Sequence, residues 1–282
     1  MKTQPYLETA RYDDPEMYAD SAGLRQNSDA RWALGLLPEH RFRYSLDVGC
    51  GNGDFLAELL RTERVSKRVA GIDRSQAMVD SARRKLELLA GSLELRLERV
   101  DVLEFPSVSD TFDLVTMMAV LHWLYPEEAR VFAWIAEQLE RDGIFCLTTY
   151  HPTVDNRSRG GSDDVALTAM ALVGGPTEFP DGFLPMGRRA RSASEVELLL
   201  GKFFRIGEVH SRAAVTRVTD SQQYIRFHQG TFGSYYSQLL PSDRQASFLE
   251  AIGEVALDRM KEFNYVTSME VRCWICLPRP AG

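Results

Sequence analysis

The chain has 282 residues, 44% hydrophobic and 26% charged, which excludes intrinsic disorder and small disulfide-held scaffolds. Its 33 basic and 40 acidic side chains give a net charge of −7, which argues against a nucleic-acid partner because such binding needs a basic face. No apolar run approaches the roughly 18 residues of a membrane helix and the amino terminus lacks a signal-peptide core, so we expect a soluble, cytoplasmic protein with no membrane partner.

The first 37 residues predict a helical arm. A polar and aromatic stretch that includes Tyr18 leads into residues 24–37, where apolar side chains recur near helical spacing. Pro38 is expected to end this helix.

Residues 38–150 alternate between predicted strands and helices. Alternation of helices with largely apolar strands indicates a parallel sheet that is covered on both faces. The predicted strands cover 44–50, 68–73, 93–100, 112–120 and 143–149, and the predicted helices cover 53–62, 76–90, with Ser75 as its N-cap, and 126–140.

The regular pattern loosens after Tyr150. Residues 151–190 contain six glycines and four prolines, so we expect mostly loop there. A helix at about 193–202 and a strand at about 204–216 then resume the pattern. The predicted plan is a single α/β domain with an arm (1–37), a core (38–150), a loop insertion (151–190), more core (191–218), a helical cap interrupted at Gly230, Gly233 and Pro241 (219–264), and a last core strand (265–282).

The four cysteines do not form a metal set. Cys273 and Cys276 are close in sequence, but residues three apart on a strand point to opposite faces, and no second pair completes a zinc site. We therefore expect buried free thiols, as is usual in a reducing compartment, and no metal.

The first core strand runs into a glycine-rich turn with the pattern DxGxGxG, residues 47–53. Glycines allow a tight turn and close approach of a ligand, which in doubly wound sheets lies beyond the carboxyl ends of the strands. A dinucleotide site needs glycine where this chain has Asp54, so a nicotinamide oxidoreductase is disfavoured. Two acids follow the next strands: Asp73 is suited to ribose hydroxyls and Asp101 to an adenine amino group.

These elements resemble the class I S-adenosylmethionine (SAM)-dependent methyltransferases over about residues 44–149. The resemblance rests on DVGCGNG, on Asp73 in GIDRS, on Asp101 in VDVLEF and on FDLVTMMAVLHWL. It implies a Rossmann-like, seven-stranded, mostly parallel sheet with a helical arm and cap, and SAM as cofactor with S-adenosylhomocysteine (SAH) as product. The segment Ala119–Leu124 resembles the trans-aconitate and juvenile-hormone-acid branch, whereas bacterial indole C3-methyltransferases share the same core and a similar cap.

The resemblance also implies a cofactor site. The glycines pass under the methionine part, Asp73 binds the ribose, Asp101 takes the adenine edge, and Tyr18 closes over the cofactor from the arm. The full set of predicted cofactor residues is Tyr18, Gln26, Asp47, Gly49, Cys50, Gly51, Asp73, Arg74, Met78, Asp101, Val102 and Met118.

Residues near the carboxyl ends of later strands are candidates for handling the acceptor's proton. His122, Tyr150 and His151 are the catalytic candidates, each with a structural role as its alternative. Aromatic side chains at near-helical spacing in the cap predict a substrate lining or, alternatively, ordinary cap core. The substrate-binding candidates are Trp123, Tyr224, His228, Phe232 and Tyr235.

The resulting hypothesis is a small-molecule methyltransferase of natural-product biosynthesis. The aromatic cap favours C-methylation of a planar, indole-type substrate, and carboxyl O-methylation of an apolar or polycarboxylic acid is the closest alternative. A non-catalytic SAM-binding partner subunit is the alternative of another class. The sequence leaves a homodimer open.

Overall fold

The computed structural model describes residues 14–22, 24, 26–105, 111–152 and 161–279. The chain divides into two compact units, and each is built from separate stretches of sequence. Unit 1 comprises Met1–Gln26, Pro152–Ala190 and Ala213–Glu270, and unit 2 comprises Asn27–His151, Arg191–Arg212 and Val271–Gly282.

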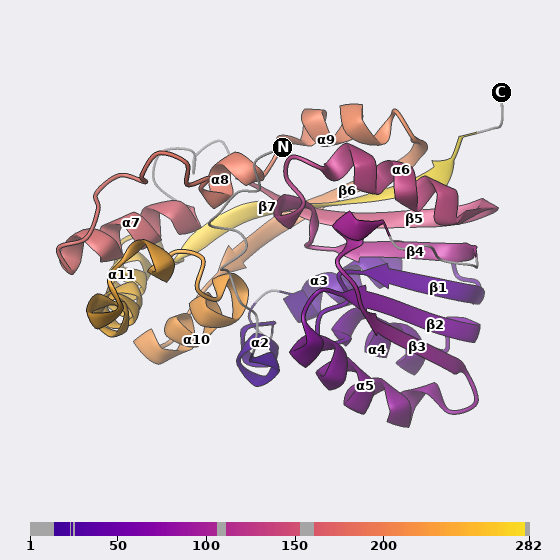
Figure 1. Ribbon diagram of the computed structural model, residues 1–282, viewed down its shortest axis with the longest axis horizontal. Coiled ribbons are helices and arrows are strands. Elements are labelled where there is room, and N and C mark those ends of the chain that lie inside the picture. The colour runs from indigo at the N-terminus through magenta and orange to yellow at the C-terminus, as the bar shows by residue number, and fades with distance from the viewer. Residues whose placement is uncertain (1–13, 23, 25, 106–110, 153–160, 280–282) are drawn as a thin grey trace. The chain divides into compact units, whose positions relative to one another are not determined.

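A seven-stranded sheet in the order β3-β2-β1-β4-β5-β7-β6 organises the fold (Figure 1). The pairs β1–β2, β1–β4, β2–β3 and β4–β5 are parallel, which confirms the expected mostly parallel, Rossmann-like sheet. The strands are β1 (Phe42–Val48), β2 (Val65–Asp73), β3 (Glu94–Arg99), β4 (Phe112–Met118), β5 (Leu139–Pro152), β6 (Phe204–Thr216) and β7 (Thr267–Pro278).

Helices of unit 2 cover both faces of this sheet, as the apolar strands predicted (Figure 1). One face packs against apolar residues of α3, α4 and α5, and the other against those of α6 and α9. The bounds are α3 (Gln26–Leu36), α4 (Asp54–Arg61), α5 (Gln76–Ala90), α6 (Glu128–Gln138) and α9 (Ala193–Leu200).

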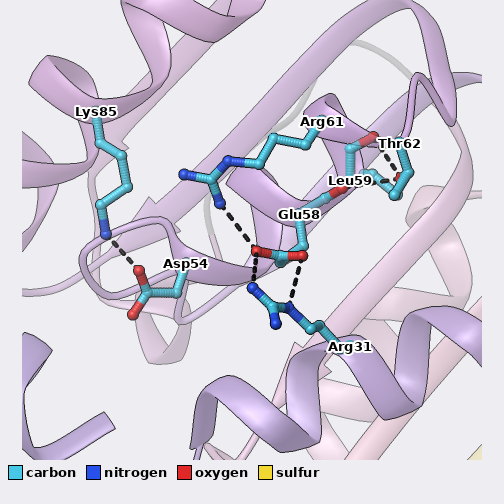
Figure 2. Close-up of polar contacts among 7 residues, drawn as sticks. All are labelled: Arg31, Asp54, Glu58, Leu59, Arg61, Thr62 and Lys85. Carbon is cyan, nitrogen blue, oxygen red and sulfur yellow. Dashed lines mark hydrogen bonds and ion pairs between the residues drawn. The ribbon is translucent and has the colours of Figure 1, made fainter. Parts of the chain in front are cut away.

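Ion pairs on the surface join α4 to its neighbours (Figure 2). Arg31 of α3 and Arg61 both contact the Glu58 carboxylate, at 3.1 and 2.9 Å, and Lys85 of α5 pairs with Asp54. Exposed pairs of this kind contribute about 0.2–1 kcal/mol each. The apolar side of α4, which is buried, therefore contributes most of its attachment.

The cysteines lie as predicted. Cys273 packs in the core on one face of the sheet and Cys276 in the core on the other. All four cysteines are buried and free, and burial raises the pKa of Cys276 to about 12.

Unit 1 contains more helix than the sequence indicated. The stretch expected to be mostly loop includes α7 and α8, because Val165, Ala166, Ala169 and Met170 form a buried helical stripe that its flanking glycines obscured. The helices of this unit are α2 (Pro15–Ala22), α7 (Ser162–Leu172), α8 (Met186–Arg189), α10 (Ser221–Phe232) and α11 (Gln245–Phe263).

Gly230 does not interrupt the cap helix as predicted but lies within α10. A Cβ atom there would lie 2.6 Å from the Met17 carbonyl oxygen and 2.6 Å from Ser21 Oγ. The residue is therefore glycine because α2 packs closely on α10 at this point. Gly233, by contrast, ends α10 with φ 54°.

No helix in the described part of the chain is long and apolar enough to span a membrane.

Candidate functional site

The glycine-rich turn connects β1 to α4 in a conformation that requires glycine. Gly49 has φ +74°, and a Cβ atom added to it would lie 2.4 Å from Cγ2 of Val120. Gly53 has φ +80° at the N-cap of α4, and its added Cβ would lie 3.0 Å from Cβ of Ala82 in α5. Val120 and α5 thus pack against the turn at Gly49 and Gly53, where only glycine fits, and the turn follows the carboxyl end of β1.

Asp47, on β1 just before the turn, is a buried carboxylate with a neighbouring hydroxyl. It is 2% exposed and accepts a hydrogen bond of 2.7 Å from Thr116 Oγ1, its register partner on β4. Burial raises the pKa of Asp47 to about 7, the Thr116 hydrogen bond opposes this shift, and the charge of Asp73 adds to it. Thr116 was not predicted from the sequence because the sequence of either strand alone does not determine the register between β1 and β4.

Asp73 lies at the end of β2 and binds the glycine-rich turn directly. Its two carboxylate oxygens accept hydrogen bonds of 2.9 Å from the backbone N–H groups of Gly51 and Ser75. Burial raises the pKa of this carboxyl, and the two amides and Arg74 oppose the shift. A carboxylate offers about four acceptor positions, so these bonds leave capacity for two further hydroxyl donors.

Asp101 follows β3 and caps the short helix η1 (Val102–Glu104). Its Oδ1 accepts a hydrogen bond of 2.9 Å from the N–H of Leu103, so this oxygen caps the helix. The second oxygen leaves the residue able to accept from a ligand as well. Val102 beside it is buried.

The turn and the two acids follow three neighbouring parallel strands, β1, β2 and β3. The carboxyl ends of parallel strands meet at one edge of a sheet, so these groups share that edge. Asn52 also belongs to the turn: it is 1% exposed, and its Nδ2 has no hydrogen-bond partner within the described part of the chain. Its position inside the motif was a signal that sequence reasoning did not use.

Cys50 contributes backbone rather than side chain to this edge. The Cys50 side chain is 6% exposed and packs in the core, and burial raises its thiol pKa well above the ordinary value. Arg74 is half-buried beyond β2, and Met78, 3% exposed, lies in the first turn of α5, where the Ser75 side chain accepts from its N–H.

The end of β4 brings Met118, His122 and Trp123 into one short stretch. Thr148 of β5 donates to Met118 Sδ at 3.4 Å. His122 and Trp123 lie in the helical turn η2 (Leu121–Trp123), both half-buried, with ring centroids 5.1 Å apart. The strand therefore presents all three at its carboxyl end, where the sequence placed them.

Tyr150 and His151 are adjacent on β5 but have different surroundings. The Tyr150 hydroxyl donates to the Asp29 carboxylate of α3. His151 is 4% exposed, with Nδ1 2.7 Å from the carbonyl oxygen of Arg191 and its ring 5.5 Å from that of Trp274. These contacts favour a structural role for His151, and its catalytic role stays a prediction.

The predicted substrate aromatics form a buried cluster in unit 1. Tyr224, His228, Phe232 and Tyr235 are all 5% exposed or less, and the His228 ring lies 5.2 Å from Phe232. Burial lowers the pKa of His228 to about 3, so this imidazole is neutral. Its Nε2 has no hydrogen-bond partner among the described residues.

Two predicted cofactor residues come from the arm. Tyr18 is half-buried in α2, and its carbonyl oxygen accepts from Ser21 Oγ at 2.7 Å. Gln26 begins α3, and its side chain lies outside the described part of the structure. Within the described residues, no group of three or more His, Cys, Asp or Glu side chains could hold a metal ion.

Known proteins share this arrangement. A family profile described as a methyltransferase domain matches residues 46–143, which contain the glycine-rich turn and both acids. The trans-aconitate 2-methyltransferase of Deinococcus radiodurans is 31% identical over 134 residues, which is 48% of this chain and 48% of that protein. The demethylmenaquinone methyltransferase of Lactobacillus johnsonii is 32% identical over 111 residues, 39% of this chain and 45% of that protein.

The chain thus spans about half the length of the curated relatives it matches. A solved SAM-dependent methyltransferase from Geobacter sulfurreducens, in complex with SAH, superposes with a TM-score of 0.56 at 16% identity. The superposition covers 95% of this chain and all of that one. At this identity the superposition shows the fold alone.

The profile, the relatives and the site geometry agree. Residues 46–143 match a methyltransferase domain, and the fold is that of the solved SAM-dependent methyltransferase.

The residues at the carboxyl edge of the sheet fit SAM. Asp73 retains acceptor capacity for two hydroxyls, Asn52 offers a buried donor, and the turn admits no side chain at Gly49. The two relatives are named for an acid and for a quinone, so they do not define one acceptor chemistry.

Proposed function

We propose that this chain transfers the methyl group of SAM to carbon of a small, planar, indole-type molecule in natural-product biosynthesis. The observation that carries the cofactor half of the proposal is the alignment of the glycine-rich turn, Asp73 and Asp101 after three neighbouring strands. The acceptor half rests on the buried aromatic cluster of unit 1, whose apolar surroundings suit a planar ring.

The cofactor's parts are assigned to the site residue by residue. Asp73 would accept both ribose hydroxyls, and Asp101 with Val102 would take the adenine edge. Arg74 and Met78 would pack on the adenine ring. The methionine part would lie over the turn, with Tyr18, Gln26, Asp47, Gly49, Cys50 (through its backbone), Gly51 and Met118 around it.

When bound, the cofactor supplies an electrophilic methyl carbon on a sulfonium with a good leaving group. The acceptor's electron pair would form the new bond to methyl, the electron pair of the C–S bond would stay on sulfur, and an indole-type acceptor would pass its N–H proton to a base, for which His122, Tyr150 and His151 are the candidates. The protein's contribution is to hold the two reactants in line and exclude water. A hydroxyl or imidazole that accepts a hydrogen bond from the acceptor's N–H would make the carbon more nucleophilic.

A specific observation favours carboxyl O-methylation as the second candidate. Arg189 is 1% exposed within the aromatic region of unit 1, where its Nε donates to Tyr235 Oη at 2.8 Å. A buried guanidinium is suited to bind a carboxylate. An acid acceptor would use this cation, whereas an indole would not need it.

The cofactor assignment is tested by calorimetry with SAH. We expect micromolar or tighter binding by the wild type and at least a hundredfold weaker binding by Asp73→Ala, because charged hydrogen bonds contribute about 1.5–3 kcal/mol each. Arg61→Ala, which changes an exposed ion pair of α4, is the matched control and should bind normally. Equal affinity in Asp73→Ala would refute the ribose contact.

The acceptor is tested with labelled SAM and three probes: 3-methylindole, trans-aconitate and reduced 1,4-naphthoquinone. Transfer to carbon gives a product that resists base, whereas a methyl ester releases methanol on alkaline hydrolysis. An N-methyl product resists base as well, so NMR must locate the new methyl group: methylation at an indole carbon supports the proposal, and ester formation supports the second candidate. SAH binding without transfer to any acceptor in a broad panel would instead favour a non-catalytic partner subunit.

We also infer a cytoplasmic location from the buried free thiols, which suit a reducing compartment. A small-molecule substrate follows from the proposed chemistry, and the homodimer stays a prediction.

A further inference from the structure

A polar network in unit 2, buried at Tyr150 and Asp29 and partly exposed at Arg212, includes the hydroxyl of Tyr150. Tyr150 Oη donates to Oδ2 of Asp29 in α3, and Arg212 Nη2 of β6 pairs with the other oxygen, Oδ1. The Asp29 side chain is 9% exposed. The Arg212 guanidinium also lies over the ring of Trp32, 4.8 Å from its centroid. Asp29 of α3 thus connects the phenol of Tyr150 on β5 to Arg212 of β6.

The hydrogen bonds of this network have a defined direction. The Tyr150 hydroxyl donates its hydrogen to one oxygen of the Asp29 carboxylate, and the guanidinium of Arg212, which can only donate, binds the other oxygen. With its hydrogen used in this way, the phenol oxygen can serve a further partner as an acceptor.

The strand places this oxygen near the reacting end of the sheet. Thr148 pairs in register with Met118 at the end of β4, and Tyr150 lies two residues further along β5. Residues two apart on a strand point to the same face, so Tyr150 lies on the face of Thr148, whose hydroxyl contacts Met118 Sδ.

Stability alone does not account for this arrangement. The Asp29 side chain, 9% exposed, gives up most of its hydration whereas that of Arg212 stays 32% exposed, and apolar side chains of similar size often hold two elements together equally well. Helix α3 and strand β5 are already joined by apolar packing, with Ala33 and Cys146 in one core. The polar network therefore adds direction to the tyrosine rather than attachment to the helix.

We propose that Asp29 and Arg212 are positioning residues that fix the Tyr150 hydroxyl as a hydrogen-bond acceptor for the N–H or O–H of the methyl acceptor. The proposal deepens the proposed function and rests on it. The proposal also predicts a substrate class: the site should bind acceptors that carry an N–H or O–H group more tightly than otherwise identical acceptors that lack one.

The test compares two probes that differ at one atom. The affinities of 3-methylindole and 1,3-dimethylindole, which lacks the N–H, are measured by calorimetry on SAH-loaded protein. The wild type should prefer the N–H probe by about fivefold to tenfold, as one net hydrogen bond allows. In Tyr150→Phe, which leaves the Asp29–Arg212 pair intact, the preference should fall to about one.

The positioning role is tested by variants that leave the phenol in place. Asp29→Asn should lower the preference below about twofold, and Arg212→Lys, which keeps the charge but loses the planar fork, should give an intermediate value. Arg31→Ala is the control, because Arg31 lies beside Trp32 on α3 but pairs with Glu58 (Figure 2). It should keep the wild-type preference, and all variants should bind SAH normally.

The outcomes separate this proposal from the proposed function. Absence of SAH binding by the wild type would refute the proposed function and, because the present proposal rests on it, overturn both. With SAH bound, absence of the N–H preference in the wild type, or its survival in Tyr150→Phe, would overturn the present proposal. A preference lost in Tyr150→Phe but retained in both Asp29→Asn and Arg212→Lys would overturn the positioning role.

Discussion

At the residue scale, the site depends on a position where no side chain fits. Gly49 has a positive φ, and a Cβ atom added to it would lie only 2.4 Å from Cγ2 of Val120. The turn would therefore have to shift to admit even one methyl group. A shift there would move the backbone that Asp73 holds through Gly51. Alanine at position 49 would cause both backbone strain and steric overlap, and a second glycine of positive φ without a close neighbour allows the two effects to be measured separately.

Gly49→Ala should weaken SAH binding at least tenfold and lower the unfolding free energy by more than about 2 kcal/mol, because strain and overlap add. Gly91→Ala is the matched control: Gly91 has φ +58° but nothing within 4 Å of an added Cβ. It should cost about 1 kcal/mol and leave SAH binding unchanged. Adding Val120→Ala to Gly49→Ala should restore part of the affinity, and a double variant no better than Gly49→Ala would exclude the overlap as the cause.

Asp47 gives a residue-scale prediction about pH. The pKa of its carboxyl rises from an ordinary 3.8 to about 7 in the folded chain, chiefly through burial, so the folded state binds the proton more tightly than the unfolded state. Its contribution to stability is therefore complete below about pH 4 and is lost as the pH rises toward 7, with a slope of at most about 1.4 kcal/mol per pH unit.

Asp47→Asn keeps an acceptor for Thr116 but cannot ionise, so it should be more stable than the wild type at pH 8 and lose that advantage toward pH 4. Urea unfolding of both proteins across this range measures the difference, and the contributions of other titrating groups cancel in it. Parallel pH profiles for the two proteins would show that Asp47 is not the group responsible.

At the element scale, glycine within a helix has opposite effects in two places. Gly35 in α3 has nothing within 4 Å of an added Cβ, whereas Gly230 in α10 faces the backbone of α2 at 2.6 Å. Intrinsic propensity alone predicts that alanine stabilises both helices by up to about 1 kcal/mol. The contact with α2 reverses that expectation for Gly230.

We expect Gly35→Ala to raise the unfolding free energy slightly and Gly230→Ala to lower it by about 1–3 kcal/mol while loosening α2. Hydrogen exchange of the α2 amides reports the loosening directly. Unchanged protection of α2 in Gly230→Ala would mean that the helices adjust without separating.

The same contrast explains what the sequence could predict at this scale. Strands β1 to β7 and the Ser75 cap were predictable because each depends on local pattern, and β7 even placed Cys273 and Cys276 on opposite faces as expected. Gly230 was misread because its reason lies in α2, about two hundred residues away. The partners Thr116, Asp29 and Arg212 were missed for the same reason: their roles depend on register and packing between distant segments.

At the scale of the whole molecule, the two units carry different parts of the proposed function. The turn, Asp73, Asp101 and Met118 belong to unit 2, whereas Tyr18, Gln26 and the aromatic cluster belong to unit 1. Cofactor binding should therefore stabilise some segments of the chain against hydrogen exchange more than others. Ligand binding at a hundred times Kd stabilises whatever it binds by about 2.7 kcal/mol.

Hydrogen exchange with and without SAH should resolve this inequality. We expect strong added protection at 47–53, 73–78 and 101–104 in unit 2, because these segments would contact the cofactor. Helices α10 and α11 of unit 1 should change little until an acceptor is added as well. Added protection of α2 with SAH alone would support the predicted arm contacts of Tyr18 and Gln26, whereas equal added protection of α11 and of the three segments in unit 2 would contradict the division of roles.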